Sequence, residues 1–474
     1  MNDYGMMLPL RLQGKELDDS DDGRRMRYRR YLDFYNGEQF STPAKAGERR
    51  LTLNYARLLV NKTASFMLGA GVKYECADQA AEEALAKVVA DNGLNLLDYE
   101  TAIDAAILGD GAWKVTGDRS KEQGARSNNG NQDFSPTTDN RRLITVRSVD
   151  VFNLAVEWAG DDVRRVRQVT ECYELSPGEA TRILGVNLLA GSDYVRVSEI
   201  WTEGEFRLQI EGQTERVRPN PYGFIPYVIF PNLRRPRLFW GESDLADIME
   251  LCSELNTRLS VMSQILQLSG NPVLVLENVQ DSAGLRVGPG AVWHLPEDSK
   301  AYLLNLLEHG GLDAHLNYIS TLYQSIHDLA EMPQAAFGRS ELAGRVSSGV
   351  ALDVLLQPVI QKIARKRAIW SEALLRRAKL ILLLLGFGAD TEVRVNWSPI
   401  LPRDYAGLVA NEIALVGQGI HSRMTANRNL GEESPADEVA TALYEAMEWA
   451  KAGGKSSQLK VSGALVQGLA QAAG

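Results

Sequence analysis

The longest regular pattern of apolar positions in the chain runs from residue 240 to residue 385. Apolar side chains recur there every three or four positions, which predicts long helices. A compact β-rich stretch interrupts the pattern after the first helix, and a loop interrupts it before the third. Residues rich in Gly and Pro supply the stops. The expected helices cover residues 240–269, 309–333 and 349–385, and the stops are the Ser-Gly-Asn-Pro run at 269–272, Pro333 and Gly386.

Before residue 240 the pattern changes between helical stretches and stretches that alternate like strands. The connections between the expected strands are short, so we expect an antiparallel sheet and an α+β fold class. Residues 117–140 contain almost nothing apolar and are interpreted as a disordered surface loop. The expected helices are 24–35, 54–69, 80–108 with a break at Asn92-Gly93, and 177–184; the expected strands are 112–116, 143–147, 166–174, 194–201, 206–211 and 227–230.

After the third long helix, the alternation of residues 392–397 predicts a strand, and Pro399 and Pro402 indicate a boundary. Helices are then expected at 412–417, 425–429 and 435–451, the last with Ser434 as its N-cap. The final residues, 453–474, are small and polar, which is typical of a flexible tail.

Composition and charge narrow the class of protein. A chain of 474 residues exceeds the size of one core and suggests two to four domains. A net charge of −10 argues against a protein that coats nucleic acid with a basic face, but it allows one that lets nucleic acid pass. The three widely spaced cysteines are interpreted as reduced packing residues. Without a signal-peptide pattern or an apolar run of about 18 residues, we expect neither export nor membrane insertion.

The charges of the long helices are unevenly distributed. Between Arg237 and Arg258 every charged residue is acidic, and between Lys300 and Arg339 the same holds. The third helix is instead basic, with seven Lys and Arg residues between positions 362 and 379. The simplest interpretation is that these charges face solvent or pair between neighbouring helices.

Motifs for an enzyme are incomplete, so we expect no catalysis, no cofactor and no metal site. The Gly-Gly-Lys-Ser run at 453–456 has Trp449 where a phosphate-binding loop needs glycine. Gly69-Ala70-Gly71 lacks the third glycine of a dinucleotide-binding turn. The five histidines do not show metal-ligand spacing with the cysteines, and Gly338-Arg339-Ser340 does not continue as a nucleophile elbow.

One family resemblance follows from several short segments that occur in a fixed order. The run Phe-Ile-Pro-Tyr-Val-Ile-Phe-Pro-Asn at 224–232, then Trp-Gly-Glu-Ser-Asp-Leu at 240–245, then Leu255-Asn256, resembles the core signature of tailed-bacteriophage portal proteins, in particular the long-tailed, siphovirus-type branch. Further matching segments are residues 31–37, 54–69, 337–338 with 348–352, and 419–422. Together the segments cover most of the chain.

The resemblance implies a non-enzymatic homo-oligomeric ring, normally of twelve subunits, at one capsid vertex of the virion, assembled in the host cytoplasm. Double-stranded DNA would be packaged and ejected through it. Its expected partners are the terminase large subunit, head-completion and tail adaptor proteins, and the major capsid and scaffolding proteins. The implied parts are an N-terminal arm and wing at 1–239, stem helices at 240–269 and 309–333, a clip at 270–308, a tunnel loop at 334–348, a long helix kinked at Pro358 with a wing strand at 349–400, a helical crown at 401–452 and a tail at 453–474.

Helix geometry is compatible with such a channel. Twelve helices packed about 9 Å apart form a circle about 34 Å across, which leaves a bore of roughly 24 Å. A DNA duplex is on the order of 20 Å wide. An acidic or neutral wall would not hold the duplex, whereas a wall rich in lysine would.

The candidate channel residues lie on the second stem helix and on the loop that follows it. On the loop, Arg339 and Arg345 either touch phosphates or pair with Glu341 or a neighbouring subunit. The stem-wall candidates are Asp313, Asp328 and Glu331; the tunnel-loop candidates are Gln334, Phe337, Arg339, Ser340, Glu341, Arg345 and Ser347.

Two other classes of protein remain as hypotheses. A non-channel helical adaptor or minor capsid assembly protein would share the amphipathic helices but not the bore, and an uncharacterised hydrolase is a third class. The mass of the purified protein separates them, because only the channel protein needs a closed ring.

Overall fold

The computed structural model describes residues 21–40, 42–45, 48–69, 71–117, 144–184, 194–211, 215–270, 274–278, 297–303, 311–338, 349–401, 405–431 and 438–444. The chain divides into two compact units, Met1–Ile400 and Leu401–Gly474. The expected loop at 117–140 and the expected tail at 453–474 lie almost wholly outside the described residues.

Helices and strands are mixed along unit 1, and every described ladder is antiparallel, which confirms the α+β class. The helices are α1 (Asp21–Asn36), α2 (Tyr55–Leu68), α3 (Gln79–Asp91), α4 (Leu94–Leu108), α6 (Pro177–Leu184), α7 (Met249–Gly270), α8 (Gly311–Leu329) and α9 (Gly349–Leu385), with short 3-10 helices η1 (Val151–Asn153) and η3 (Gln334–Phe337). The strands are β1 (Val72–Cys76), β2 (Asp110–Gly117), β3 (Ile144–Ser148), β4 (Leu154–Trp158), β5 (Val166–Leu175), β6 (Val195–Trp201), β7 (Glu205–Ile210), β8 (Arg216–Pro219), β9 (Tyr227–Pro231), β10 (Leu274–Glu277), β11 (Lys300–Leu303) and β12 (Val393–Trp397).

The described strands form four sheets. Their orders are β4-β5-β6-β7-β8, β3-β2-β9, β1-β12 and β10-β11. The pair β1-β12 joins strands more than 300 residues apart, with Val72 opposite Trp397. The apolar pattern predicts β12 but misses β1, β4 and β8, each of which has only four or five residues.

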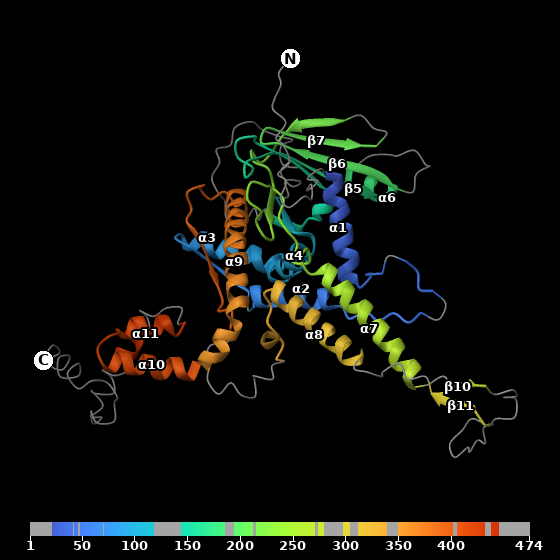
Figure 1. Ribbon diagram of the computed structural model, residues 1–474. Coiled ribbons are helices and arrows are strands. Elements are labelled where there is room, and N and C mark those ends of the chain that lie inside the picture. Colours follow the sequence, from blue (N-terminus) through green and yellow to red (C-terminus); the bar gives the residue numbers. More distant parts are fainter. Residues whose placement is uncertain are drawn as a thin grey trace, which may run out of the picture. The chain divides into compact units, whose positions relative to one another are not determined.

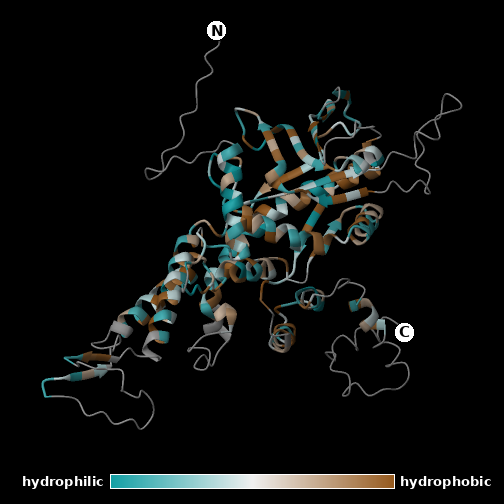
Figure 2. Ribbon diagram, turned by 90° about the vertical axis from the view of Figure 1, so that its right-hand side faces the viewer, coloured by the Kyte–Doolittle hydropathy of each residue, from teal (hydrophilic) through white to brown (hydrophobic). Residues whose placement is uncertain are grey.

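The central sheet β3-β2-β9 separates two hydrophobic cores. Successive side chains of a strand point to opposite faces. On β2, Trp113 faces the core shared with α9, whereas Ala112 faces the core shared with the five-stranded sheet. On β9, Phe230 faces the core shared with α9 and Ile229 faces the core shared with the five-stranded sheet. Both faces of β9 are therefore covered, and every residue of β9 is buried. Figure 2 shows hydrophobic positions concentrated on these strands and on the helices around them.

Helix α9 is the longest element, with 37 residues, and it packs on the central sheet through Trp370. The Trp370 ring centroid lies 5.3 Å from that of Trp113 and 5.0 Å from that of Phe230. Pro358 lies inside α9. Figure 1 shows the first turns of α9 bending away from the axis of the rest, as expected from the missing N–H and the ring of a proline.

The first long helix begins later than the apolar pattern predicts. We expected it directly after Gly241, but residues 244–248 form turns and α7 begins at Met249. The Ser243 hydroxyl donates to the Ala106 carbonyl oxygen (3.1 Å) and accepts from the Leu245 N–H (3.0 Å). Such local side-chain bonds compete with the helical backbone pattern, and they correct the prediction.

Other element predictions are confirmed within a few residues. The break at Asn92-Gly93 separates α3 from α4, with Gly93 in the left-handed conformation (φ 58°). Gly386 ends α9 at φ 95°. The three cysteines are free thiols, and Cys252 packs in the core at 1% exposure. Of the described helices, none combines the length and the apolar run that a membrane span requires.

Unit 2 contains α10 (Tyr405–Gly417) and α11 (Arg423–Asn429), and residues 438–444 are also helical. The Glu412 carboxylate joins the two helices, since it accepts from Asn429 Nδ2 (2.9 Å) and bonds His421 Nδ1 (2.8 Å). Helix α10 begins earlier than the expected residue 412. The expected N-cap Ser434 lies outside the described residues.

Candidate functional site

Helices α7 and α8 form the frame of the candidate site. Figure 1 shows them side by side, leading to the small sheet β10-β11. Buried apolar residues hold the pair to its surroundings, among them Leu255 and Met262 on α7 and Leu322 and Ile326 on α8. The Arg258 guanidinium, paired with Glu254 at 2.6 Å, lies 5.5 Å from the Tyr318 ring centroid and adds a polar link between the helices.

The opposite side of α8 is open to solvent in the single chain. The predicted wall residues Asp313 and Asp328 are both exposed there. Leu316 and Leu329 are also about half exposed. This helix therefore has one side that packs within the chain, and it exposes two carboxylates and parts of two leucines to solvent.

The acidic character that the sequence suggests for the first stem helix is not a property of α7 as a whole. Glu242, Asp244 and Asp247 precede Met249 and so lie outside α7. Of the two remaining acidic residues, Glu254 is paired with Arg258. Glu250 is exposed, as are Asp313 and Asp328 on α8, so both helices present carboxylates to solvent.

The end of α8 is held by side chains of α9. Lys362 Nζ donates to the Ala330 carbonyl oxygen at 2.9 Å, where a cation complements the negative end of the helix dipole. The next residue, Glu331, is a predicted wall residue with φ 51°, a left-handed conformation that costs a side-chain-bearing residue roughly 1–2 kcal/mol. Its carboxylate accepts two bonds from Arg365 Nη2, at 2.5 and 2.6 Å.

The predicted tunnel loop begins with an ordered turn rather than with irregular chain. Gln334 and Phe337 belong to η3, both half-buried, and Gly338 follows with φ 70°. Pro333 precedes the turn, and the buried Ala336 anchors it. The remaining loop candidates, which are Arg339, Ser340, Glu341, Arg345 and Ser347, lie outside the described residues.

A histidine without metal-ligand spacing to a cysteine organises this turn. His327 on α8 is buried, and its Nδ1 lies 2.7 Å from the Met332 carbonyl oxygen. Aromatic rings of Tyr323, Tyr55 and Phe337 surround it, with centroids 4.5, 6.4 and 5.4 Å away. The spacing of Tyr323 and His327, one helical turn apart, is the signal that could have indicated an aromatic cluster.

A buried ion cluster joins three parts of unit 1, which are α9, the segment that follows β9 and the turns that precede α7. Lys366 Nζ on α9 bonds Asp244 Oδ2 (2.7 Å) and Asn232 Oδ1 (2.6 Å), and Lys362 Nζ lies 3.7 Å from Asp244 Oδ1. The three charged side chains are at most 6% exposed. Burial lowers the pKa of Lys366 to about 8. Burial alone would raise the pKa of Asp244, but the two ammonium groups hold it below its usual value.

Described contacts thus hold the first residues of the predicted tunnel loop and the end of α8. Residues 334–338 attach to α8 and to His327, and α9 carries the lysines that bind the end of α8 and the core. Among the described residues, no group of three or more metal-binding side chains occurs. The described contacts therefore hold η3 and the end of α8 to the folded body of unit 1.

Comparison with known protein families finds one family whose profile matches most of the chain. The profile of the family described as "Phage portal protein, SPP1 Gp6-like" matches residues 15–132 and 184–456. The second range contains α7, α8 and α9 without interruption. None of the curated proteins matches the sequence.

Proposed function

Because the chain belongs to the SPP1 Gp6-like family of phage portal proteins, we propose that α7 and α8 form the stem of its DNA channel. Portal proteins of this family are not enzymes; they assemble into rings that form the DNA-packaging channel at a capsid vertex. The single observation that carries the proposal is the unbroken family match over residues 184–456. It favours a channel over a non-channel helical adaptor and over a hydrolase.

The parts of the subunit follow from this premise. The arrangement of α7 and α8, which lead side by side to β10-β11, supports their roles as stem and clip. We assign residues 1–239 to the arm and wing, 240–269 and 309–333 to the stem, 270–308 to the clip, 334–348 to the tunnel loop, 349–400 to the kinked helix and wing strand, 401–452 to the crown and 453–474 to the tail.

Asp313 and Asp328 supply the carboxylates of the channel wall. Their exposure on the open side of α8 supports this role. The charge of Glu331 is largely compensated by Arg365, so Glu331 contributes less to the field in the bore. Each phosphate neutralised by Lys or Arg adds affinity for DNA. A wall that presents carboxylates instead lets a duplex slide.

The tunnel loop provides the transient contacts to the duplex. Phe337 holds its beginning against His327 of α8, and Gln334 belongs to the same turn. Arg339 and Arg345 reach phosphates, while Ser340, Glu341 and Ser347 complete the lining. Two arginines per subunit, set against the carboxylates of α8, make contacts that are too weak to stop translocation.

The channel needs partner proteins in addition to the portal subunit. We assign twelve subunits to the ring, which docks the terminase large subunit during packaging and head-completion and tail adaptor proteins afterwards. The major capsid and scaffolding proteins surround it in the virion. Because portal proteins are not enzymes, the terminase supplies the energy for DNA movement.

Two measurements test the proposal. Negative-stain imaging and native mass of the purified protein should show a closed ring with a central hole, and a monomer or dimer would contradict it. The variant Arg339→Glu with Arg345→Glu should form the same ring but package shorter DNA. The matched control is Arg207→Glu with Arg216→Glu, two exposed arginines of the five-stranded sheet, which should package full-length DNA.

A further inference from the structure

Helix α7 carries two polar side chains at positions closed to solvent. Asn256 is 0% exposed and Ser260 is 8% exposed, and the two residues lie one helical turn apart. Asparagine is a weak helix former, and a buried polar group destabilises a protein unless it is hydrogen-bonded. Asn256 also belongs to one of the segments that resemble the portal signature. The partners of its side chain therefore indicate what the residue does.

These partners lie in the loop between α1 and α2, residues 37–54, which is described at 37–40, 42–45 and 48–54. We call it the α1–α2 loop. The Leu53 N–H donates to Asn256 Oδ1 at 2.9 Å, and the Leu51 N–H donates to Ser260 Oγ at 2.9 Å. Two residues of extended chain span about 6.6 Å and four residues of a helix rise about 6 Å, so the two spacings match. Figure 1 shows this loop beside α7.

The amide of Asn256 bonds the α1–α2 loop near both of its ends. Its Nδ2 donates to Gln39 Oε1 near the start of the loop, while its Oδ1 accepts from Leu53 near the end. A side-chain amide can accept and donate at once, which an aliphatic side chain or an ionised carboxylate cannot do. The Ser260 hydroxyl adds to the contact, because it donates to the Asn256 carbonyl oxygen (2.7 Å) while it accepts from Leu51.

The α1–α2 loop is in turn attached to the folded body of unit 1. Asn54 Nδ2 donates to the Tyr35 carbonyl oxygen at the end of α1 (2.8 Å), and Asn54 is also the N-cap of α2. Both α1 and α2 pack on α4. Within the loop, Arg50 Nε bonds Glu48 Oε1 at 2.8 Å. A chain of hydrogen bonds therefore runs from α7 through the loop to the helices of the body.

We propose that the α1–α2 loop holds α7 at a fixed position in the channel, and that Asn256 is the positioning residue of this contact. The inference rests on the proposed function, in which α7 is a stem helix. A bore of roughly 24 Å leaves a gap of about 2 Å on each side of a duplex on the order of 20 Å wide. A shift of α7 toward the axis by that distance would obstruct the duplex. The contact to the loop prevents this shift.

Hydrogen exchange of the assembled protein tests the contact. Asn256→Ala removes the acceptor of the Leu53 N–H, and a buried N–H without an acceptor is destabilising. Exchange at Leu53 and in α7 after residue 256 should become about tenfold faster, because this part of the chain opens locally. Exchange in β2 and β9 should stay as in the wild type. Unchanged exchange at Leu53, or the same acceleration in β2 and β9, would overturn the inference.

Packaging of DNA separates a positioning role from a stabilising one. Rings of Asn256→Ala should package several-fold less DNA than wild-type rings, and normal packaging would overturn the inference. The conservative variant Asn256→Asp keeps an oxygen for the Leu53 N–H, so its exchange and packaging should lie between those of the other two proteins. Ser260→Ala is a smaller change that removes only the acceptor of Leu51, so exchange should accelerate mainly at that residue.

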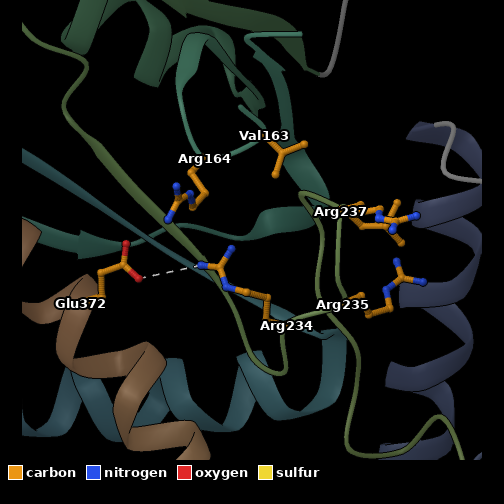
Figure 3. Close-up of a pocket in the computed structure, with 7 residues that line it drawn as sticks. Val163, Arg164, Arg234, Arg235, Arg237 and Glu372 are labelled. Carbon is orange, nitrogen blue, oxygen red and sulfur yellow. Dashed lines mark ion pairs between the residues drawn. The ribbon is translucent and has the colours of Figure 1, made fainter. Parts of the chain in front are cut away.

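The matched control removes a contact between distant segments that lies at the surface. Arg234, which follows β9, is 3.9 Å from Glu372 of α9, and both side chains are more than a third exposed. The pair lines a pocket of about 300 Å³, which we call the arginine pocket (Figure 3). Its other lining residues are Val163, Arg164, Arg235, Arg237 and Leu238. Arg234→Gln should exchange in α7 and package DNA like the wild type, because exposed pairs contribute little.

The two readouts distinguish this inference from the function on which it rests. A wild-type protein without rings would refute the proposed function, whereas the exchange comparison would still show whether the α1–α2 loop holds α7. If wild-type and Asn256→Ala rings package DNA equally well, the proposed function stands and the positioning role of Asn256 is refuted.

Discussion

At the scale of single residues, the basic side chains of α9 show that charged residues close together in the sequence do not all lie on the protein surface. Lys366 and Arg377 are at most 1% exposed, and each is paired with an aspartate, Asp244 or Asp98. The expectation that such charges pair between neighbouring helices is confirmed for Arg377, whose partner Asp98 lies on α4, whereas the partner of Lys366 lies in the turns before α7. The sequence could not indicate the partners, because Asp98 lies 279 positions from Arg377 and only the fold brings them together.

The ion cluster around Asp244 leads to the first prediction at this scale. Asp244→Ala should lower the free energy of unfolding by about 3–5 kcal/mol, since Lys362 and Lys366 would remain buried without a counter-charge. Thermal and urea unfolding of the purified protein at a fixed concentration measure the loss.

The matched control is an ion pair at the surface. Glu205→Ala removes the partner of Arg207, and both of these side chains are about half exposed. This change should cost less than about 1 kcal/mol. If both variants lost the same free energy of unfolding, the buried cluster would not stabilise the fold more than a surface ion pair does.

At the scale of elements, the pattern of apolar positions predicts the long helices better than their beginnings. Periodicity identifies α8 and α9 because their buried faces repeat over many turns. It fails at the start of α7, where Ser243 and Asp244 look like a helical N-terminus but bond elsewhere. It also misses β1, whose pairing with β12 depends on a partner strand far along the chain.

Gly241 provides the prediction for this junction. A Cβ atom there would lie 2.5 Å from the Gly109 carbonyl oxygen and 2.8 Å from that of Leu233, both of them backbone atoms. Gly241→Ala should therefore push apart the end of α4 and the segment after β9, at a cost of about 1–3 kcal/mol. The shift would also weaken the bond from the Gly241 N–H to Asp110 (2.7 Å).

Urea unfolding with Gly178→Ala as the control checks this prediction. A Cβ at Gly178, in the first turn of α6, meets no atom within 4 Å, and alanine favours the helix there. The control should be neutral or slightly stabilising. An unchanged unfolding midpoint for Gly241→Ala would contradict the close approach of the two backbones.

At the scale of the whole molecule, the sequence predicts the class and the family, and Pro399 and Pro402 indicate the boundary at which the chain divides into two units. The resemblance to portal proteins is carried by segments whose order spans the chain, and the family match confirms it. The channel residues of the loop stay a prediction. The arginine pocket was missed, because its lining joins residues from positions 163 to 372 that share no local pattern.

The division at Ile400 predicts how the chain tolerates truncation. Both hydrophobic cores of unit 1 consist of residues up to Ile400. Removal of residues 401–474 should therefore leave the amide protection of β1 and β12 unchanged in hydrogen exchange. The matched truncation after residue 391 also removes β12, so it should expose Val72 and Tyr74 and speed exchange in β1. If the first truncation also lost protection in β1, the two units would not be independent.

The position of residues 339–348 in the sequence, between η3 and α9, has a consequence for how this part of the protein can be changed. Its anchors, η3 on one side and the lysines of α9 on the other, belong to the folded body and do not depend on what is inserted between them. Substitutions, grafts from other portals or an inserted peptide tag should leave the rest of the subunit intact. The segment can therefore diversify while the scaffold stays constant, so its variants should unfold at the wild-type temperature.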